Sequence, residues 1–222
     1  MKTFVIVPVY NEEFRVIRLV KKILSIVKNK IIIVDDGSTD NSLEMIKKAF
    51  DKNRRIVILS HIFNLGKGAA MKTGVKMAFK AGGEAVIFID SDGQHKPKDL
   101  NVFNDKLKSY PLVFGYRDLN DEMPLIRKFG NEISKSIVNK LFHINRKDFL
   151  CGFWGFKKEV YKKIKWKSNR YGVETEVATK LGKNKLSFCE VKIDTIYIDK
   201  YKGVTIFDAF RILSKIPFWY FN

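Results

Sequence analysis

Two carboxylates and one amide alternate with other residues directly after a short apolar run. The run Val86–Ile89 leads into Asp90 and Asp92, and Gln94 follows two residues later. Such a run is typical of a strand buried on both faces. Like charges held this close repel each other unless a cation lies between them. Their oxygens suit Mg²⁺ or Mn²⁺, which can also take diphosphate oxygens. The pattern predicts a divalent-cation site; the plainer alternative is a turn with solvated aspartates.

Strands and helices alternate along the first half of the chain. Apolar periodicity predicts strands over 3–9, 31–34, 55–60 and 85–90. It predicts helices over 12–28 and 69–81, and a further helix that begins after an N-cap at Asp40. This alternation predicts an α/β fold with a parallel, doubly wound sheet. Right-handed crossovers bring the strand ends to one edge, where such sheets bind ligands. We expect four polar segments to meet there: Tyr10–Glu12, Asp35–Asp36, Asn64–Gly68 and Asp90–Gln94.

These polar segments carry groups that suit a nucleotide. The carboxylate of Asp36 can accept a hydrogen bond from a nucleobase or a ribose, while Tyr10 offers a ring wall and Glu12 a further acceptor. Lys67, between two glycines, indicates contact with a diphosphate. The loop around it lacks the other glycines of a dinucleotide fingerprint and is not a Walker A loop. Dinucleotide-binding and P-loop proteins are therefore disfavoured.

The chain of 222 residues has a formal net charge of +18, which is unevenly distributed. Met123–Arg170 holds thirteen Lys or Arg residues against three acidic ones. Such a balance implies an anionic partner: nucleic acid, anionic lipid or a phosphorylated substrate. The sequence contains no helix-turn-helix, aromatic RNA-binding pattern or zinc finger. We therefore expect no nucleic-acid partner, and keep a nucleic-acid-binding protein only as a remote alternative.

The second half has fewer clear signals. We expect one domain over 1–222, divided into 1–117, 118–204 and an amphipathic C-terminal segment, 205–222. Strands are expected over 112–116 and 186–198, and helices over 124–142, 173–182 and 205–221. The last helix either packs on the core or lies in a membrane interface, where its terminal aromatic residues are favoured. Two cysteines without metal-site spacing fit a reducing cytoplasm, and no apolar run is long enough for a transmembrane helix.

Four segments resemble, in order and at suitable spacing, the motifs of family 2 glycosyltransferases. They are Val5–Glu13, Val34–Asp40, Asn64–Ala70 and Asp90–Gln94. The resemblance implies a nucleotide-diphospho-sugar transferase (GT-A type) fold, with a mostly parallel central sheet flanked by helices, and inverting transfer. It places the donor, in the 1–117 half, at Pro8, Tyr10, Glu12, Asp36, Lys67, Asp90 and Ser91. It implies a metal cofactor, Mg²⁺ or Mn²⁺, at Asp90, Asp92 and Gln94.

The second half resembles the dolichyl-phosphate (polyprenyl-phosphate) mannose and glucose synthases. Three segments carry this resemblance: Arg127–Asn131, Asp148–Phe153 and Tyr171–Glu176. It implies a polyprenyl or dolichyl phosphate acceptor, bound in the 118–204 half and at its border by Arg117, Arg127, Asn131 and Lys202. Asp92, Arg117 and Arg127 would be the catalytic residues.

The chemistry of the acceptor leaves two alternatives. A phosphate monoester is already anionic at pH 7, since its second pKa is about 6. It needs cations for orientation rather than a base, and Arg suits paired contacts with phosphate. A glycan hydroxyl needs a general base, for which Glu174 and Glu176 are the candidates. With a lipid acceptor, we expect a protein bound peripherally to the cytoplasmic face of the cell membrane.

Overall fold

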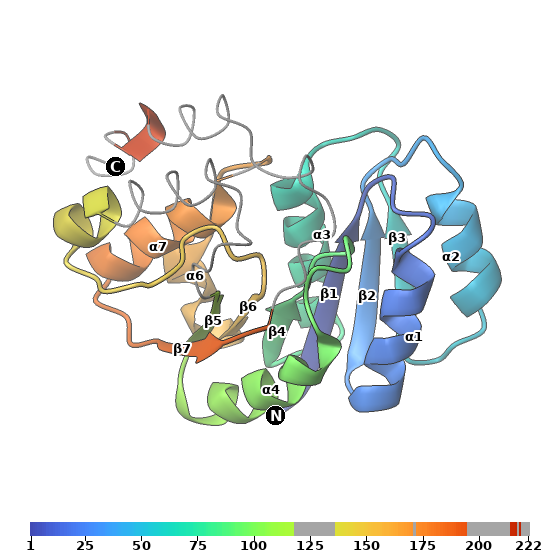
Figure 1. The fold of residues 1–222 in the computed structure, drawn as a ribbon, viewed down its shortest axis with the longest axis horizontal. Coiled ribbons are helices and arrows are strands. Elements are labelled where there is room, and N and C mark those ends of the chain that lie inside the picture. The colour runs from blue at the N-terminus through green and yellow to red at the C-terminus, as the bar shows by residue number, and fades with distance from the viewer. Residues whose placement is uncertain (118–135, 171, 195–213, 217, 219–222) are drawn as a thin grey trace.

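The computed structural model describes residues 1–117, 136–170, 172–194, 214–216 and 218. Within these residues, seven strands form one sheet in the order β3-β2-β1-β4-β6-β5-β7. Helices cover both faces of this sheet (Figure 1). The chain therefore has the flanked α/β architecture that its alternating pattern predicts.

The first half follows the predicted alternation. Its elements are β1 (Thr3–Val9), α1 (Val16–Ile26), β2 (Lys30–Asp35), α2 (Ser42–Phe50), β3 (Ile56–Ser60), α3 (Lys67–Lys80) and β4 (Ala85–Phe88). β1 pairs in parallel with β2 and β4, and β2 pairs in parallel with β3. The predicted N-cap of α2 is wrong by one residue, since Asn41 occupies it. Asp40 still supports this turn by accepting a hydrogen bond from the amide of Ser42 at 3.0 Å.

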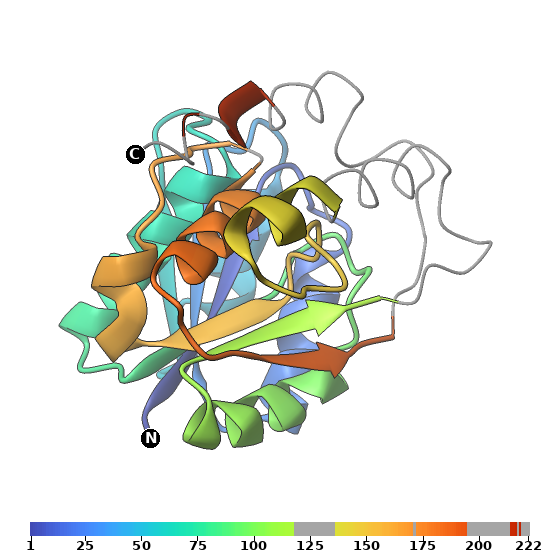
Figure 2. The ribbon, with the colours of Figure 1, turned by 90° about the vertical axis from the view of Figure 1, so that its left-hand side faces the viewer.

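The second half adds an antiparallel strand inside the sheet. Its elements are η1 (Pro97–Asp99), α4 (Leu100–Ser109), β5 (Leu112–Tyr116), β6 (Trp154–Lys157), η2 (Lys158–Val160), α6 (Tyr161–Ile164), α7 (Val173–Lys183) and β7 (Cys189–Lys192). β6 lies antiparallel between β4 and β5, while β7 is parallel to β5. Figure 2 shows β6, β5 and β7 side by side. The sheet is mostly parallel, as expected, although the sequence did not predict β6.

Three predicted elements are described only in part. Residues 136–142 are helical and form the end of the helix expected over 124–142. The strand expected over 186–198 is present as β7, and residues 195–198 lie outside the described residues. Of the helix expected over 205–221, residues 214–216 and 218 are described and helical. Among the described residues, no helix combines the length and the hydropathy needed to cross a membrane.

Alternate side chains of the central strands form two hydrophobic cores. Val5 and Val7 of β1 pack with residues of α1, α2 and α4 on one face of the sheet. Phe4 and Ile6 of the same strand pack with residues of α3, α6 and α7 on the other face. A strand buried on both faces reads as a continuous apolar run, and the first-half strands show this pattern. The two cores hold β1 and β4 rigidly between them.

The strand directions bring several loops to one edge of the sheet. β5 runs in the same direction as β4, because each is antiparallel to β6. The carboxyl ends of β1 to β5 therefore lie at one edge, at the top of Figure 1. Ligands of open α/β sheets bind at this edge. Each polar segment singled out in the first half follows one of these strands.

Candidate active site

Residues from three elements meet at the carboxyl end of β4. The ammonium of Lys67, the first residue of α3, lies 2.7 Å from Oδ1 of Asp90 and 3.1 Å from Oε1 of Glu174. Glu174 comes from the first turn of α7. A Cβ added to Gly152 would lie 2.1 Å from Oδ2 of Asp90 and 2.6 Å from Nζ of Lys67. The backbone at Gly152 therefore lies against this ion pair, and a side chain there would displace Asp90 or Lys67.

The charges of Lys67, Asp90 and Asp92 at the carboxyl end of β4 do not balance one another. Burial alone would lower the pKa of Lys67, but Asp90 and Glu174 more than reverse this and raise it. Burial would raise the pKa of Asp90, but the charges of Lys67 and His95 hold it well below its usual range. The pKa of Asp92 is raised, first by burial and then by the neighbouring charge of Asp90. Asp92 therefore adds a negative charge that the surrounding cations do not fully balance.

This donor set fits a hard divalent cation. Asp92 Oδ1 accepts a hydrogen bond from the amide of Gln94 at 3.0 Å, so one turn holds both side chains. Nε2 of His95 lies 3.8 Å from Oδ2 of Asp90. Among the described residues, no group of three or more His, Cys, Asp or Glu is arranged to hold a metal. Two carboxylates are nevertheless enough for Mg²⁺ when substrate phosphates and water supply the other ligands.

The carboxylate of Asp36 accepts hydrogen bonds from the loop that leads to Lys67. It is 2% exposed and accepts hydrogen bonds from His61 Nδ1 at 2.7 Å, from the amide of Leu65 at 3.1 Å and from the amide of Gly66 at 2.7 Å. These bonds fix the start of α3. The preceding Asp35 is also buried, and its Oδ1 has no hydrogen-bond partner among the described residues. In the segment Asp35–Asp36, Asp36 therefore supports the loop before Lys67, and Asp35 has an oxygen without a hydrogen-bond partner among the described residues.

The remaining donor candidates lie on or beside β1 and β4. Tyr10 is 44% exposed at the end of β1, as expected for a ring that could stack on a base. Glu12 is buried, and its Oε2 lies 3.2 Å from Nη1 of Arg15. Pro8, within β1, and Ser91, between the two aspartates, are also buried. The structure thus brings these residues to the predicted edge, with Tyr10 the most accessible of them.

The two glutamates proposed as alternative bases have different surroundings. Glu174 lies in the site beside Lys67. Glu176 is 1% exposed and accepts hydrogen bonds from the amides of Lys167 and Ser168 and from Oγ of Ser168. Burial would raise the pKa of Glu176, but a hydrogen bond from Lys180 and those from 167–168 lower it. Glu176 therefore fastens the segment after Trp166, and Glu174 is the better placed of the two for chemistry.

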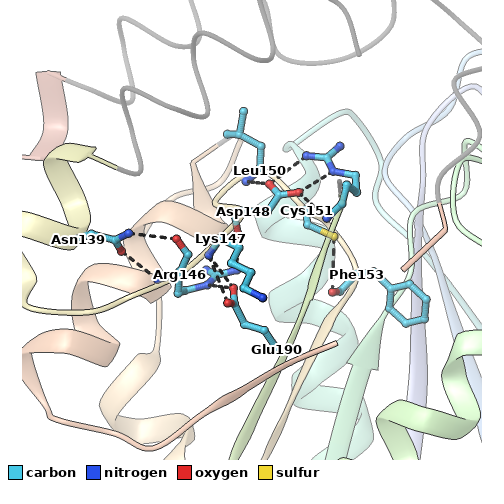
Figure 3. A network of polar contacts seen from close by, with 9 residues as sticks. Asn139, Arg146, Lys147, Asp148, Leu150, Cys151, Phe153 and Glu190 are labelled. Carbon is cyan, nitrogen blue, oxygen red and sulfur yellow. Dashed lines mark hydrogen bonds and ion pairs between the residues drawn. The ribbon is translucent and has the colours of Figure 1, made fainter. Parts of the chain in front are cut away.

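Arg117 follows β5 and is bound to Asp148. The guanidinium Nε donates to Oδ2 of Asp148 at 2.7 Å, and Nη2 donates to Oδ1 at 3.1 Å. Figure 3 shows the turn around Asp148, whose Oδ1 also accepts the amide of Leu150 at 2.9 Å. Burial would raise the pKa of Asp148, but Arg117 and these hydrogen bonds hold it below its usual range. Arg127, Asn131 and Lys202, the other predicted phosphate ligands, lie outside the described residues.

Sequence reasoning missed three residues that shape the site. Asp148 and Gly152 lie in the segment Asp148–Phe153, but their sequence positions do not indicate that Asp148 contacts Arg117 or that Gly152 lies against Asp90. His61 gave no signal beyond its position after a strand, although it binds Asp36. All three act on side chains that the sequence did single out. Their roles depend on contacts between segments that are distant in the chain.

Comparisons with known proteins agree with this arrangement. The family model described as glycosyl transferase family 2 matches residues 4–165. An uncharacterised protein of Methanocaldococcus jannaschii is 34% identical, over 96% of this chain and 90% of that protein. A UDP-N-acetylglucosamine–dolichyl-phosphate N-acetylglucosaminyltransferase of Methanococcus voltae is 31% identical, over 96% of this chain and 94% of that protein.

A solved structure shows the same fold. Glucosyl-3-phosphoglycerate synthase from Mycobacterium tuberculosis, in complex with Mn²⁺, uridine diphosphate and phosphoglyceric acid, aligns with a TM-score of 0.77. The alignment covers 99% of this chain and 78% of that chain at 15% identity. The GT-A type fold predicted from the motifs is therefore confirmed.

Proposed function

Because the chain belongs to glycosyltransferase family 2, we propose that it transfers a hexose from a nucleotide-diphospho-sugar to a polyprenyl or dolichyl phosphate, with inversion at the anomeric carbon. The observation that carries this proposal is the cluster of Asp90, Asp92 and Lys67 at the carboxyl end of β4. The resemblance to the polyprenyl-phosphate sugar synthases is confirmed by the relatives of this chain. The donor would be GDP-mannose, UDP-glucose or UDP-N-acetylglucosamine.

The residues around Asp90 would bind the donor and stabilise its leaving group. Asp90 and Asp92 would hold the cation as carboxylate ligands, with the amide oxygen of Gln94 on the same side. When bound there, Mg²⁺ or Mn²⁺ neutralises the negative charge that develops on a departing nucleoside diphosphate. Lys67 would contact the diphosphate, because its ammonium lies 2.7 Å from Asp90 and is partly exposed. Pro8, Tyr10, Glu12 and Ser91 complete the proposed donor set, and Asp36 supports it through the loop that leads to Lys67.

The acceptor would enter beside Arg117. Its phosphate is already ionised near neutral pH, so the protein has to bind and orient it rather than deprotonate it. Arg117 at the end of β5, together with Arg127, Asn131 and Lys202, would supply the positive and polar contacts. Attack by a phosphate oxygen on the face opposite the diphosphate then inverts the anomeric carbon. Asp92, Arg117 and Arg127 are the residues that we propose as catalytic.

A basic surface near the site supports contact with the cytoplasmic face of a membrane. Lys162, Lys163, Lys165, Lys167 and Arg170 are all exposed around α6. Nζ of Lys167 lies 5.7 Å from the ring centroid of Phe218, which is 53% exposed. Basic residues next to an exposed aromatic ring favour anionic lipid. The segment 205–222 would add amphipathic contact, which would make the protein peripheral to the membrane.

Vesicle binding tests the basic surface separately. The double variant Lys162→Glu/Lys163→Glu should pellet less with anionic vesicles at low salt. The matched control is Lys47→Glu/Lys48→Glu, which reverses the same charges on exposed residues of α2. Since salt screens such contacts, the unmodified protein should release partly at high salt. Equal loss of binding in both variants would show that only the overall net charge matters.

One alternative keeps the same fold and donor but uses a glycan hydroxyl as the acceptor. Such a hydroxyl needs a base, and Glu174 lies in the site, beside the Lys67–Asp90 pair. Under this alternative, Glu174→Gln removes transfer and no labelled lipid forms. Glu176→Gln serves as the comparison, since Glu176 is bound to the 167–168 backbone.

A product partition separates the two acceptors. The protein is incubated with Mn²⁺, a short polyprenyl phosphate and one radiolabelled donor per tube: GDP-mannose, UDP-glucose or UDP-N-acetylglucosamine. Label extracted into organic solvent with one donor identifies both the donor and the acceptor class. Label that stays in water with every donor, as free sugar or on added glycan, contradicts the lipid-phosphate acceptor.

A further inference from the structure

Asp148 is the buried centre of a polar network beside the site. Its side chain is fully buried and receives two hydrogen bonds from the guanidinium of Arg117, which is itself 8% exposed. Oδ2 also accepts the backbone amide of Arg117, at 3.3 Å. Oδ1 accepts the amide of Leu150 at 2.9 Å. Both oxygens therefore bind groups whose positions are set by the backbone or by a rigid planar cation.

Arg146 fixes the main chain of this turn by a hydrogen bond to the backbone of Asp148. Its Nη2 donates to the carbonyl of Asp148 at 2.7 Å. Its guanidinium carbon lies 3.7 Å from the ring centroid of Phe114 and 5.1 Å from that of Phe149. Asn139 accepts the amide of Arg146 at 3.0 Å and donates to its carbonyl at 3.1 Å (Figure 3). The network thus ties the helix 136–142 to the carboxylate that binds Arg117.

We propose that Asp148 is a positioning residue, which fixes the guanidinium of Arg117 in the orientation that receives the acceptor phosphate. This inference rests on the proposed function, in which Arg117 contacts that phosphate. The contact through Nε and Nη2 is side-on and uses two parallel hydrogen bonds, so it sets the plane of the guanidinium as well as its location. A single charge–charge contact would leave this plane free to rotate.

Orientation before binding has a measurable benefit. An arginine chain has several rotatable bonds, and ordering it during binding opposes association. Asp148 keeps Arg117 ordered in the free protein, so the acceptor phosphate meets a group already in place. The network also reaches Asn139 of the helix 136–142, so the turn that carries Asp148 is held from two sides.

Steady-state kinetics on a double-mutant cycle test the proposal. We expect Arg117→Gln to lower kcat/KM for a short polyprenyl phosphate by about 100-fold, and Asp148→Asn to lower it by about tenfold. The double variant should be no worse than Arg117→Gln alone, since Asp148 acts through Arg117. KM for the nucleotide-sugar should change by less than about twofold in every variant. Losses that multiply in the double variant would overturn the positioning role.

Two further variants keep the test decisive if Asp148→Asn folds poorly. Arg117→Lys preserves the charge but cannot form the paired contact, so we expect about tenfold lower acceptor kcat/KM. Full acceptor kcat/KM in Arg117→Lys would overturn the proposal. Asp105→Asn is the control, because the Asp105 carboxylate is 70% exposed on α4 and its ion pair with Lys108 lies outside the network. We expect its acceptor kcat/KM to stay within about twofold of the unmodified protein.

The experiment also separates this inference from the proposed function. If Arg117→Gln leaves acceptor kcat/KM unchanged, Arg117 does not bind the acceptor, and both statements fail at that residue. If Arg117→Gln is impaired but Asp148→Asn and Arg117→Lys are not, the proposed function stands and the positioning role fails. Thermal unfolding of each variant, followed by circular dichroism, shows which kinetic losses come from folded protein.

Discussion

Two carboxylate–cation pairs lie at the same edge of the sheet, and they differ in how completely they are closed. Lys67 and Asp90 have side-chain exposures of 23% and 22%, and Lys67 is shared with Glu174. Arg117 and Asp148 have exposures of 8% and 0%, with two hydrogen bonds between the side chains. We call Lys67–Asp90 the open pair, because it is partly accessible and Lys67 has two partners. We call Arg117–Asp148 the closed pair, because it is enclosed and has one fixed geometry.

This difference indicates two kinds of task. An accessible ion pair can be opened by an incoming ligand, since water and other charges replace the lost contact at low cost. A fully buried pair cannot be opened in this way, because each charge left alone would be strongly destabilising. We expect the pair at Asp90 to be rearranged when the donor binds, and the pair at Asp148 to stay intact throughout.

The largest expected effect comes from removing a charge at the open pair. Asp90→Asn, or Asp92→Ala, should lower metal-dependent transfer by about 10³-fold or more, because the cation loses a carboxylate ligand. The melting temperature should fall less than in Asp148→Ala, since Lys67 keeps Glu174 as a partner. Transfer rates across a Mn²⁺ titration check this. Asp105→Asn on α4, whose carboxylate is 70% exposed, is the control. Full activity in Asp92→Ala would show that the site is wrongly assigned.

Breaking the closed pair should instead affect folding. Asp148→Ala leaves the guanidinium of Arg117 buried without its partner, so we expect a loss of about 3–5 kcal/mol in the free energy of unfolding. Urea denaturation followed by fluorescence measures this loss. The comparison is Asp90→Ala, for which a smaller loss is expected, because Lys67 keeps Glu174 as a partner. Similar losses in the two variants would mean that the pairs do not differ as described.

Competition between Lys67 and a divalent cation for Asp90 can be measured without substrate. In Lys67→Met the ammonium that faces Asp90 is absent, so we expect Mn²⁺ to bind about tenfold more tightly, which is about 1.4 kcal/mol. Electron paramagnetic resonance of free Mn²⁺ measures this affinity. Lys76→Met, an exposed position on the same helix, controls for the change in net charge. Unchanged or weaker Mn²⁺ binding in Lys67→Met would contradict competition between Lys67 and the cation.

Acid should weaken the closed pair gradually. The pKa of Asp148 is lower in the folded protein than its ordinary value of about 4, so its stabilising effect is present above that value. It is lost as the pH falls through the lower, folded-state pKa. The pKa of Glu176 is also lowered in the folded protein, so its stabilising effect is likewise lost in acid. We expect the free energy of unfolding to fall below about pH 4, and to fall less steeply in Asp148→Asn. Parallel curves for the two proteins would contradict this.

The first half was predictable because its chemistry is local in sequence. Asp36, Lys67 and Asp90 each follow an apolar strand, and the rule that parallel strands end at one edge brings them together. No comparable rule predicts the contact of Lys67 with Glu174 or that of Arg117 with Asp148. These contacts depend on how α7 and the turn at Asp148 pack against the sheet, and packing is a property of the whole fold. The second-half pairs therefore became visible only in the structure.

The strand order was also beyond the sequence pattern. Trp154–Lys157 is four residues long and contains a glycine, so neither its length nor its composition distinguishes it from a loop. Its position between β4 and β5 follows from its buried aromatic residues, Trp154 and Phe156. These rings complete the core that also contains Phe88 and Phe114. Burial of aromatic surface therefore determined a pairing that periodicity did not indicate.

The place of β6 has a consequence for the order of events during synthesis. Among the described strands, β4 and β5 are joined in the sheet through β6, which leaves the ribosome after both. Until then the nascent chain carries β4 as an edge strand of four buried apolar residues, Ala85–Phe88, with no neighbour on one side. Unpaired apolar edges promote aggregation between chains. Slow translation between β5 and β6 should therefore lower the yield of native protein, and chaperones that shield apolar edges should restore it.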